Sequence, residues 1–107
     1  MEFSVSAREG DPQNVVRVAG ELDLVTARPL EQVLAEALRT GNGWLVVDLA
    51  LVTFMDCAGL RVVLRAYEAS MRRGGGLRLV AVPGRVRTLL ALTGTQCLAA
   101  PSSRAAL

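Results

Sequence analysis

The chain has no histidine and no lysine among its 107 residues, and only two cysteines. Without histidine it lacks the most frequent general base of enzymes and the commonest metal ligand. Two cysteines do not make a disulfide framework, and reduced thiols are what a cytosolic protein carries. These shortages argue against an enzyme, a metal site and a disulfide-stabilised secreted domain.

Long hydrophobic runs are also missing, although about half of the residues are apolar. No run approaches the roughly 18 residues needed to cross a bilayer. The first residues have neither the basic nor the apolar region of a signal peptide. We therefore expect a cytoplasmic protein without direct membrane insertion. Its length fits one domain over residues 1–107, with 100–107 as a frayed tail.

Acidic residues are absent from the last third of the chain. All ten lie in residues 1–68, whereas residues 69–107 contain six arginines and no acid. This asymmetry is typical of an interaction surface or, equally, of a solvated arginine face. The chain has only four aromatic residues, and none lies among these arginines, so a stacking platform for nucleic acid is lacking. We expect no nucleic-acid partner.

Four segments read as β-strands. Phe3–Ala7 and Val15–Ala19 alternate in polarity, and the turn residues 11–14 between them predict an antiparallel hairpin. Trp44–Asp48 begins with a continuous apolar run, which is typical of a parallel strand buried on both faces. Leu77–Val82 is a further strand, and 96–99 is a candidate for a last, short one.

Helical periodicity separates these strands. Thr26 is the expected N-cap of a first helix, whose apolar face is formed by Leu30, Val33, Leu34, Ala37 and Leu38. A second helix places Leu60, Val63, Leu64, Tyr67 and Met71 on one stripe and Arg61, Arg65, Glu68 and Arg72 on the opposite, solvated stripe. A short third helix contains Val86, Leu89 and Leu90.

This order of elements predicts an α/β domain. We expect a mostly parallel, four- to five-stranded sheet with an N-terminal antiparallel hairpin and three or more helices. Gly74–Gly76 ends the second helix, and its spacing matches neither the P-loop nor the dinucleotide fingerprint. We therefore expect no cofactor.

Two loops carry the candidate site. Residues 20–26, with Glu21 and Asp23, follow the second strand, where open α/β sheets usually bind their ligands. Residues 52–61 lead into the second helix, and Asp56 and Cys57 lie at its N-terminus, where free N–H groups favour an anion. Each loop also has a purely structural interpretation, as a turn followed by a helix cap.

Taken together, the two loops resemble those of the STAS domain family, in particular its small stand-alone anti-sigma factor antagonists. The resemblance rests on Gly-Glu-Leu-Asp at 20–23 and on Val-Thr-Phe-Met-Asp at 52–56, followed by a small residue, Gly59 and Leu60. It implies a STAS-like fold and a protein partner: an anti-sigma factor that is an ATP-binding serine kinase. The positions expected to bind this partner are Glu21, Asp23, Thr26, Asp56, Cys57, Ala58, Gly59, Leu60 and Arg61.

The chain departs from the family at one position. Phosphorylation of a serine after the motif aspartate breaks the complex in such systems, and here that position is Cys57, followed by Ala58. A phosphate adds about −1.5 to −2 charges, so its loss removes the off-switch. We expect an antagonist that is not switched by phosphorylation there. Alternatives are a STAS subunit that docks on a membrane transporter ATPase and a redox sensor that uses Cys57. The oligomeric state is left open.

Overall fold

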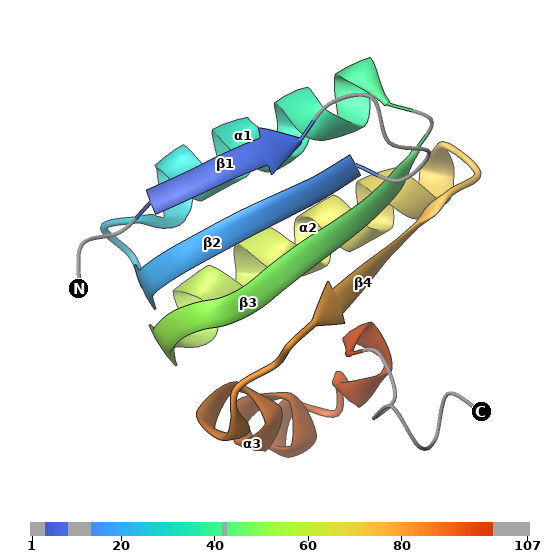
Figure 1. Ribbon diagram of the computed structural model, residues 1–107. Helices are drawn as coiled ribbons and strands as arrows, with labels where there is room; N and C mark the ends of the chain where they lie inside the picture. The colour runs from blue at the N-terminus through green and yellow to red at the C-terminus, as the bar shows by residue number, and fades with distance from the viewer. Residues whose placement is uncertain (1–3, 9–13, 42, 100–107) are drawn as a thin grey trace.

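A four-stranded sheet, with the first two helices of the chain on one face and the third beyond the end of the last strand, organises the chain (Figure 1). The computed structural model describes residues 4–8, 14–41 and 43–99. The elements, in chain order, are β1 (Ser4–Arg8), β2 (Asn14–Leu22), α1 (Ala27–Thr40), β3 (Trp44–Met55), α2 (Cys57–Arg72), β4 (Gly76–Val80), α3 (Gly84–Thr93) and the 3-10 turn η1 (Gln96–Leu98). The predicted α/β class and the three helices are confirmed.

The strands lie in the order β1-β2-β3-β4. Strands β2, β3 and β4 are parallel to one another, and β1 pairs antiparallel with β2. The turn predicted at 11–14 falls on residues outside the described part, except for Asn14, which begins β2. The predicted tail, 100–107, also lies outside the described residues.

The hydrophobic core lies between the sheet and helices α1 and α2, which both lie behind the sheet in Figure 1. Leu30 and Leu34 of α1, and Val63 of α2, are fully buried against inward-facing strand residues. The solvated stripe predicted for α2 is exposed throughout. Met71 was predicted to belong to the apolar stripe of this helix, and that prediction is wrong: the residue is 52% exposed in the last turn of α2.

The opposite face of the sheet is more open than the sequence predicted. Trp44 is 41% exposed and Val46 is half-buried, so β3 is not buried on both faces. The prediction failed because a two-layer domain covers a parallel sheet on one side only. Trp44 and Val46 are apolar and so continue the run in the sequence, but they lie on the side of the sheet that α1 and α2 do not cover.

Strand β3 is also much longer than predicted, since it continues from Asp48 to Met55. Its register against β2 shifts twice: Arg17 pairs with Asp48 but Ala19 with Leu51, and Gly20 pairs with Val52 but Glu21 with Phe54. Each shift inserts one extra residue into β3, as in a β-bulge. Because of the bulges, residues 49–55 do not show the two-residue alternation of a regular half-buried strand, and the prediction ended the strand at Asp48.

The predicted last strand at 96–99 is wrong. Residues Gln96–Leu98 form η1, and only an isolated parallel bridge between Leu79 and Ala99 extends the sheet there. Buried Leu98 fixes this turn in the core. In the described part of the chain, no helix is long and apolar enough to span a membrane.

Candidate functional site

The two loops singled out in the sequence lie side by side at the carboxyl ends of β2 and β3. Leu22 pairs with Met55 in the last register position, and the Asp56 N–H donates to the Leu22 carbonyl oxygen at 3.1 Å. Gly59, in the first turn of α2, packs on the same residue. The predicted proximity of the loops is therefore confirmed. We call residues 21–26 and 54–61 the loop end.

Asp56 caps helix α2. Its Oδ1 accepts the N–H groups of Ala58 at 2.9 Å and Gly59 at 3.0 Å, which satisfies two donors that the helix itself leaves unpaired. The carboxylate also lies at the positive end of the helix dipole. Asp56 therefore fixes where the helix begins and how the next residues are presented.

Cys57 is the first residue of α2, and its side chain is exposed. The Ala58 side chain next to it is half-buried, and Arg61, one turn further on, is exposed. Gly59 and Leu60 are buried and face the interior, so they position the loop end instead of lining its surface. The thiol thus stands where the sequence placed it, at the accessible N-terminus of the second helix.

Asp23 and Thr26 brace the other loop. The Thr26 hydroxyl donates to the Glu21 carbonyl oxygen at 2.8 Å and accepts the Asp23 N–H at 3.0 Å. Asp23 Oδ1 accepts the N–H groups of Val25 at 3.0 Å and Thr26 at 3.2 Å. The N-cap prediction for Thr26 is correct in position but wrong in mechanism, because its side chain makes no capping hydrogen bond to α1.

Only the last part of the predicted first loop is a loop. Strand β2 continues to Leu22, so Gly20 and Glu21 are strand residues. Gly20 has φ +96°, a backbone conformation that glycine adopts without strain, at the second register shift. Glu21 is exposed and pairs across the strands with Phe54.

The sequence interpretation missed three apolar side chains at the loop end. Leu24 is 79% exposed, Val25 is 83% exposed, and Phe54 is 42% exposed. Leu24 and Val25 lie at the tip of the braced loop, and the second bulge in β3 leaves Phe54 on the surface. The sequence did contain a signal for two of these side chains, because Leu24 and Val25 stand between Asp23 and Thr26 in a turn that is otherwise polar. The loop end is therefore an apolar surface with acidic neighbours.

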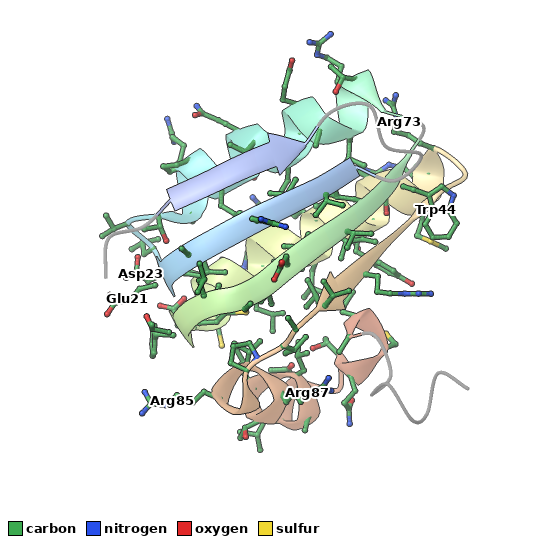
Figure 2. The ribbon with its side chains drawn as sticks, in the orientation of Figure 1. Glu21, Asp23, Trp44, Arg73, Arg85 and Arg87 are labelled. Atoms are coloured by element: carbon green, nitrogen blue, oxygen red, sulfur yellow. The ribbon has the colours of Figure 1, made fainter. Side chains whose placement is uncertain are left out.

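The basic residues of the C-terminal part are dispersed. Arg73 lies, like Trp44, at the end of the sheet opposite Glu21 and Asp23, whereas Arg85 and Arg87 are carried by α3 (Figure 2). All three are exposed. They do not form one basic face, so the charge asymmetry of the sequence becomes, in space, an acidic loop end and several separate arginines.

Comparison with known proteins agrees with this geometry. Residues 5–98 match the family model described as "Mlab, STAS domain". The anti-sigma-B factor antagonist of Staphylococcus epidermidis is 31% identical over 98 residues, which covers 92% of this chain and 91% of the relative. Both proteins are thus matched over nearly their full length.

Two solved structures show the same fold. An anti-sigma factor antagonist from Mycobacterium paratuberculosis has a TM-score of 0.83 at 30% identity and covers 98% of this chain and 91% of its own. The anti-sigma factor antagonist SpoIIAA in its unphosphorylated form has a TM-score of 0.77 at 20% identity, with 96% and 93% covered. All three of these relatives are named as anti-sigma factor antagonists.

Proposed function

The chain belongs to the STAS domain family, and from this we propose that it is a cytoplasmic anti-sigma factor antagonist. In this proposal it binds a kinase-type anti-sigma factor through the loop end and thereby releases a sigma factor. The relatives at 30% and 31% identity, matched over nearly their full length, support the antagonist role. The observation that carries the surface assignment is the exposure of three apolar side chains: Leu24 and Val25 at the tip of the braced loop, and Phe54 near the end of β3.

The composition of the loop end suits a protein partner. Stable interfaces combine a desolvated apolar centre with a polar rim. Leu24, Val25 and Phe54 supply the apolar part, and Glu21 and Asp23 supply acidic groups beside it. The hydrogen bonds of Thr26 and Asp23 hold the loop in one conformation, so less entropy is lost on binding. We infer a partner with an apolar pocket and basic groups around it.

We further propose that phosphorylation does not switch this antagonist. In the family, the acceptor is a serine at the position of Cys57, at an exposed helix start. A thiol with the same exposure leaves the docking surface in place but gives a protein-serine kinase no hydroxyl, and Ala58 supplies none either. Binding would then depend on the amounts of the two proteins.

The test is direct binding of the purified chain to kinase-type anti-sigma factors of its own organism. Val25→Glu should weaken the complex about tenfold or more, because it puts a charge into the apolar centre of the interface. Met71→Glu is the matched control, since Met71 is an exposed apolar residue at the far end of α2. Binding to no such factor, or equal binding of Val25→Glu and wild type, contradicts the proposal.

A transporter ATPase as the partner would be found by the same assay. The fold and the loop end would serve that interaction equally well, so the identity of the protein that Val25→Glu releases decides between the two partners.

A further inference from the structure

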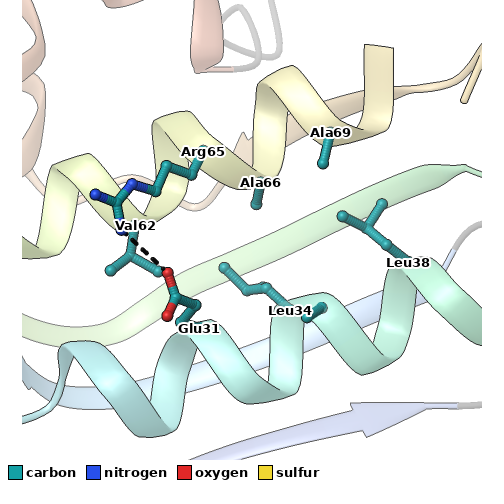
Figure 3. A pocket seen from close by; sticks show the side chains of 8 residues that line it. Glu31, Leu34, Leu38, Val62, Arg65, Ala66 and Ala69 are labelled. Atoms are coloured by element: carbon teal, nitrogen blue, oxygen red, sulfur yellow. Dashed lines mark hydrogen bonds and ion pairs between the residues drawn. The ribbon is translucent and has the colours of Figure 1, made fainter. Parts of the chain in front are cut away.

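An apolar groove lies between α1 and α2 on the helical face of the domain (Figure 3). Its volume is about 160 Å³. Core residues line its floor, since Leu34 and Leu38 of α1 and Val62 and Ala66 of α2 are all buried. Ala35 lies at the rim and is exposed, and its short side chain leaves the groove open to solvent. The groove is therefore an accessible apolar depression that reaches down to the core.

One ion pair supplies the charged side chains of this lining. Glu31 of α1 and Arg65 of α2 lie at one end of the groove, and Arg65 Nη1 lies 3.3 Å from Glu31 Oε2 (Figure 3). Both side chains are exposed, and in the described part of the chain each has only the other as a hydrogen-bond partner. A guanidinium has five N–H donors and a carboxylate has two acceptor oxygens. Most of their hydrogen-bonding capacity is therefore available to a ligand.

We propose that this groove binds a free α-amino acid with a large apolar side chain. The carboxylate of the ligand accepts hydrogen bonds from the free N–H groups of Arg65, and its ammonium group donates to Glu31. The side chain of the ligand enters the apolar part of the groove. Because an apolar cavity of about 150 Å³ holds a benzene ring, a groove of about 160 Å³ accommodates the side chain of leucine, methionine or phenylalanine.

The ion pair favours a ligand that carries both charges. An apolar acid places its carboxylate near Glu31, and an apolar amine places its ammonium group near Arg65, so each is repelled by one member of the pair. An α-amino acid offers the opposite charge to both members. Its two charged groups are attached to one carbon, which suits a pair whose atoms are 3.3 Å apart. The neighbouring exposed charges Arg28, Arg61 and Glu68 do not line the groove.

A titration of the isotope-labelled full chain with leucine tests the proposal, with amide chemical shifts as the readout. We expect saturable shifts that are largest at the residues lining the groove. The carboxylic acid and the amine with the same side chain each lack one charge and should bind at least about tenfold more weakly. Glu31→Gln should bind leucine no better than it binds the acid, and Arg65→Gln should bind leucine no better than it binds the amine.

Two matched controls separate the groove from general effects. Ala35→Leu fills the groove from its rim and should abolish binding, whereas Ala91→Leu changes an exposed alanine of α3 and should not affect it. Glu36→Gln removes an exposed carboxylate of α1 that pairs with Arg39 outside the groove, and should also leave binding unchanged.

Three results would overturn the proposal. The first is the absence of saturable shifts with leucine, methionine and phenylalanine. The second is wild type that binds the carboxylic acid or the amine as tightly as leucine, which would make the groove a site for apolar ligands of one charge. The third is binding that survives in Ala35→Leu. The groove lies along the helices and not at the loop end, so none of these results depends on the proposed function.

Discussion

Gly59 in the first turn of α2 lies directly against the backbone of Leu22 at the end of β2. A Cβ atom at position 59 would be 2.6 Å from the Leu22 carbonyl oxygen and 2.9 Å from its carbonyl carbon. The same carbonyl oxygen accepts the Asp56 N–H. The two loops of the site are thus held together by contact between main chains, which only glycine permits here.

Gly59→Ala should destabilise the protein. Alanine normally favours a helix over glycine by up to about 1 kcal/mol, but here its methyl group must displace main-chain atoms, at a cost of about 1–3 kcal/mol. Urea denaturation measures the difference in the free energy of unfolding. Gly84→Ala in the first turn of α3 is the control, because a Cβ there meets nothing within 4 Å. If both variants have the same free energy of unfolding, the close contact between Gly59 and Leu22 does not contribute to stability.

Asp56→Ala should lower the free energy of unfolding by about 0.5–2 kcal/mol, since two N–H groups of α2 lose their acceptor. Asp56→Ser should keep most of that stability, because serine also caps a helix. Chemical denaturation of both variants separates the cap from the charge. If the serine variant is stable but binds the partner weakly, the carboxylate itself contacts the partner. If it binds normally, Asp56 acts only by positioning.

Thr26→Val should loosen the loop at residues 21–26. The methyl group keeps the shape of the side chain but removes the oxygen that bonds both Glu21 and Asp23, which costs about 1 kcal/mol. Hydrogen exchange at the Asp23 amide should become faster. Thr26→Ser retains the hydroxyl and should preserve the protection. Equal exchange in the valine and serine variants would show that the hydroxyl does not brace the loop.

Cys57→Ser should create a phosphorylation site. Incubation with the partner kinase and ATP, followed by intact mass measurement, should show one added phosphate on this variant and none on wild type. Cys97→Ser is the control, since Cys97 is also exposed but lies in η1, outside the loop end. A phosphate on the wild-type chain would contradict the prediction that this antagonist is not switched.

Glu21→Gln should slow association with the anti-sigma factor, mainly at low salt. The exposed carboxylate belongs to the acidic loop end, and charges at the rim of an interface act chiefly on the association rate. Stopped-flow or surface-based kinetics at two ionic strengths measure the effect. Glu68→Gln changes the charge equally but lies on the solvated stripe of α2, and should leave the rate unchanged. Identical rates for both variants would leave Glu21 without a role in steering.

Most of the fold could be predicted because its helices are strongly periodic. The apolar stripe of α1 follows helical spacing closely, and Leu30, Leu34, Ala37 and Leu38 are all buried. Met71 fits the same period in α2 but lies in the final turn, where half of its surface is exposed. Periodicity shows which face of the helix a residue lies on, but it does not show whether the sheet still extends beneath that residue.

The site was predicted in part, for a related reason. Parallel strands bring their carboxyl ends to one edge, so the adjacency of residues 22 and 56 followed from the order of the elements. The exposure of Leu24, Val25 and Phe54 did not follow, because it depends on the tight turn at Asp23 and on a bulge late in β3. The role of Thr26 was missed because the same hydroxyl can either cap the following helix or bond to the preceding loop, and the sequence does not show which of the two it does.

The extra residues in β3 have a consequence for how this chain tolerates changes of length. The nine residues of β2 run alongside residues 45–55 of β3, and the two extra residues of β3 are taken up at Ala50 and Thr53. Deleting both would restore strict alternation and still point Val52 and Met55 inward. The interior is therefore indifferent to these two insertions. The insertions change only the exposed side of β3, where each of them places two consecutive residues on the surface: Ala50 with Leu51, and Thr53 with Phe54.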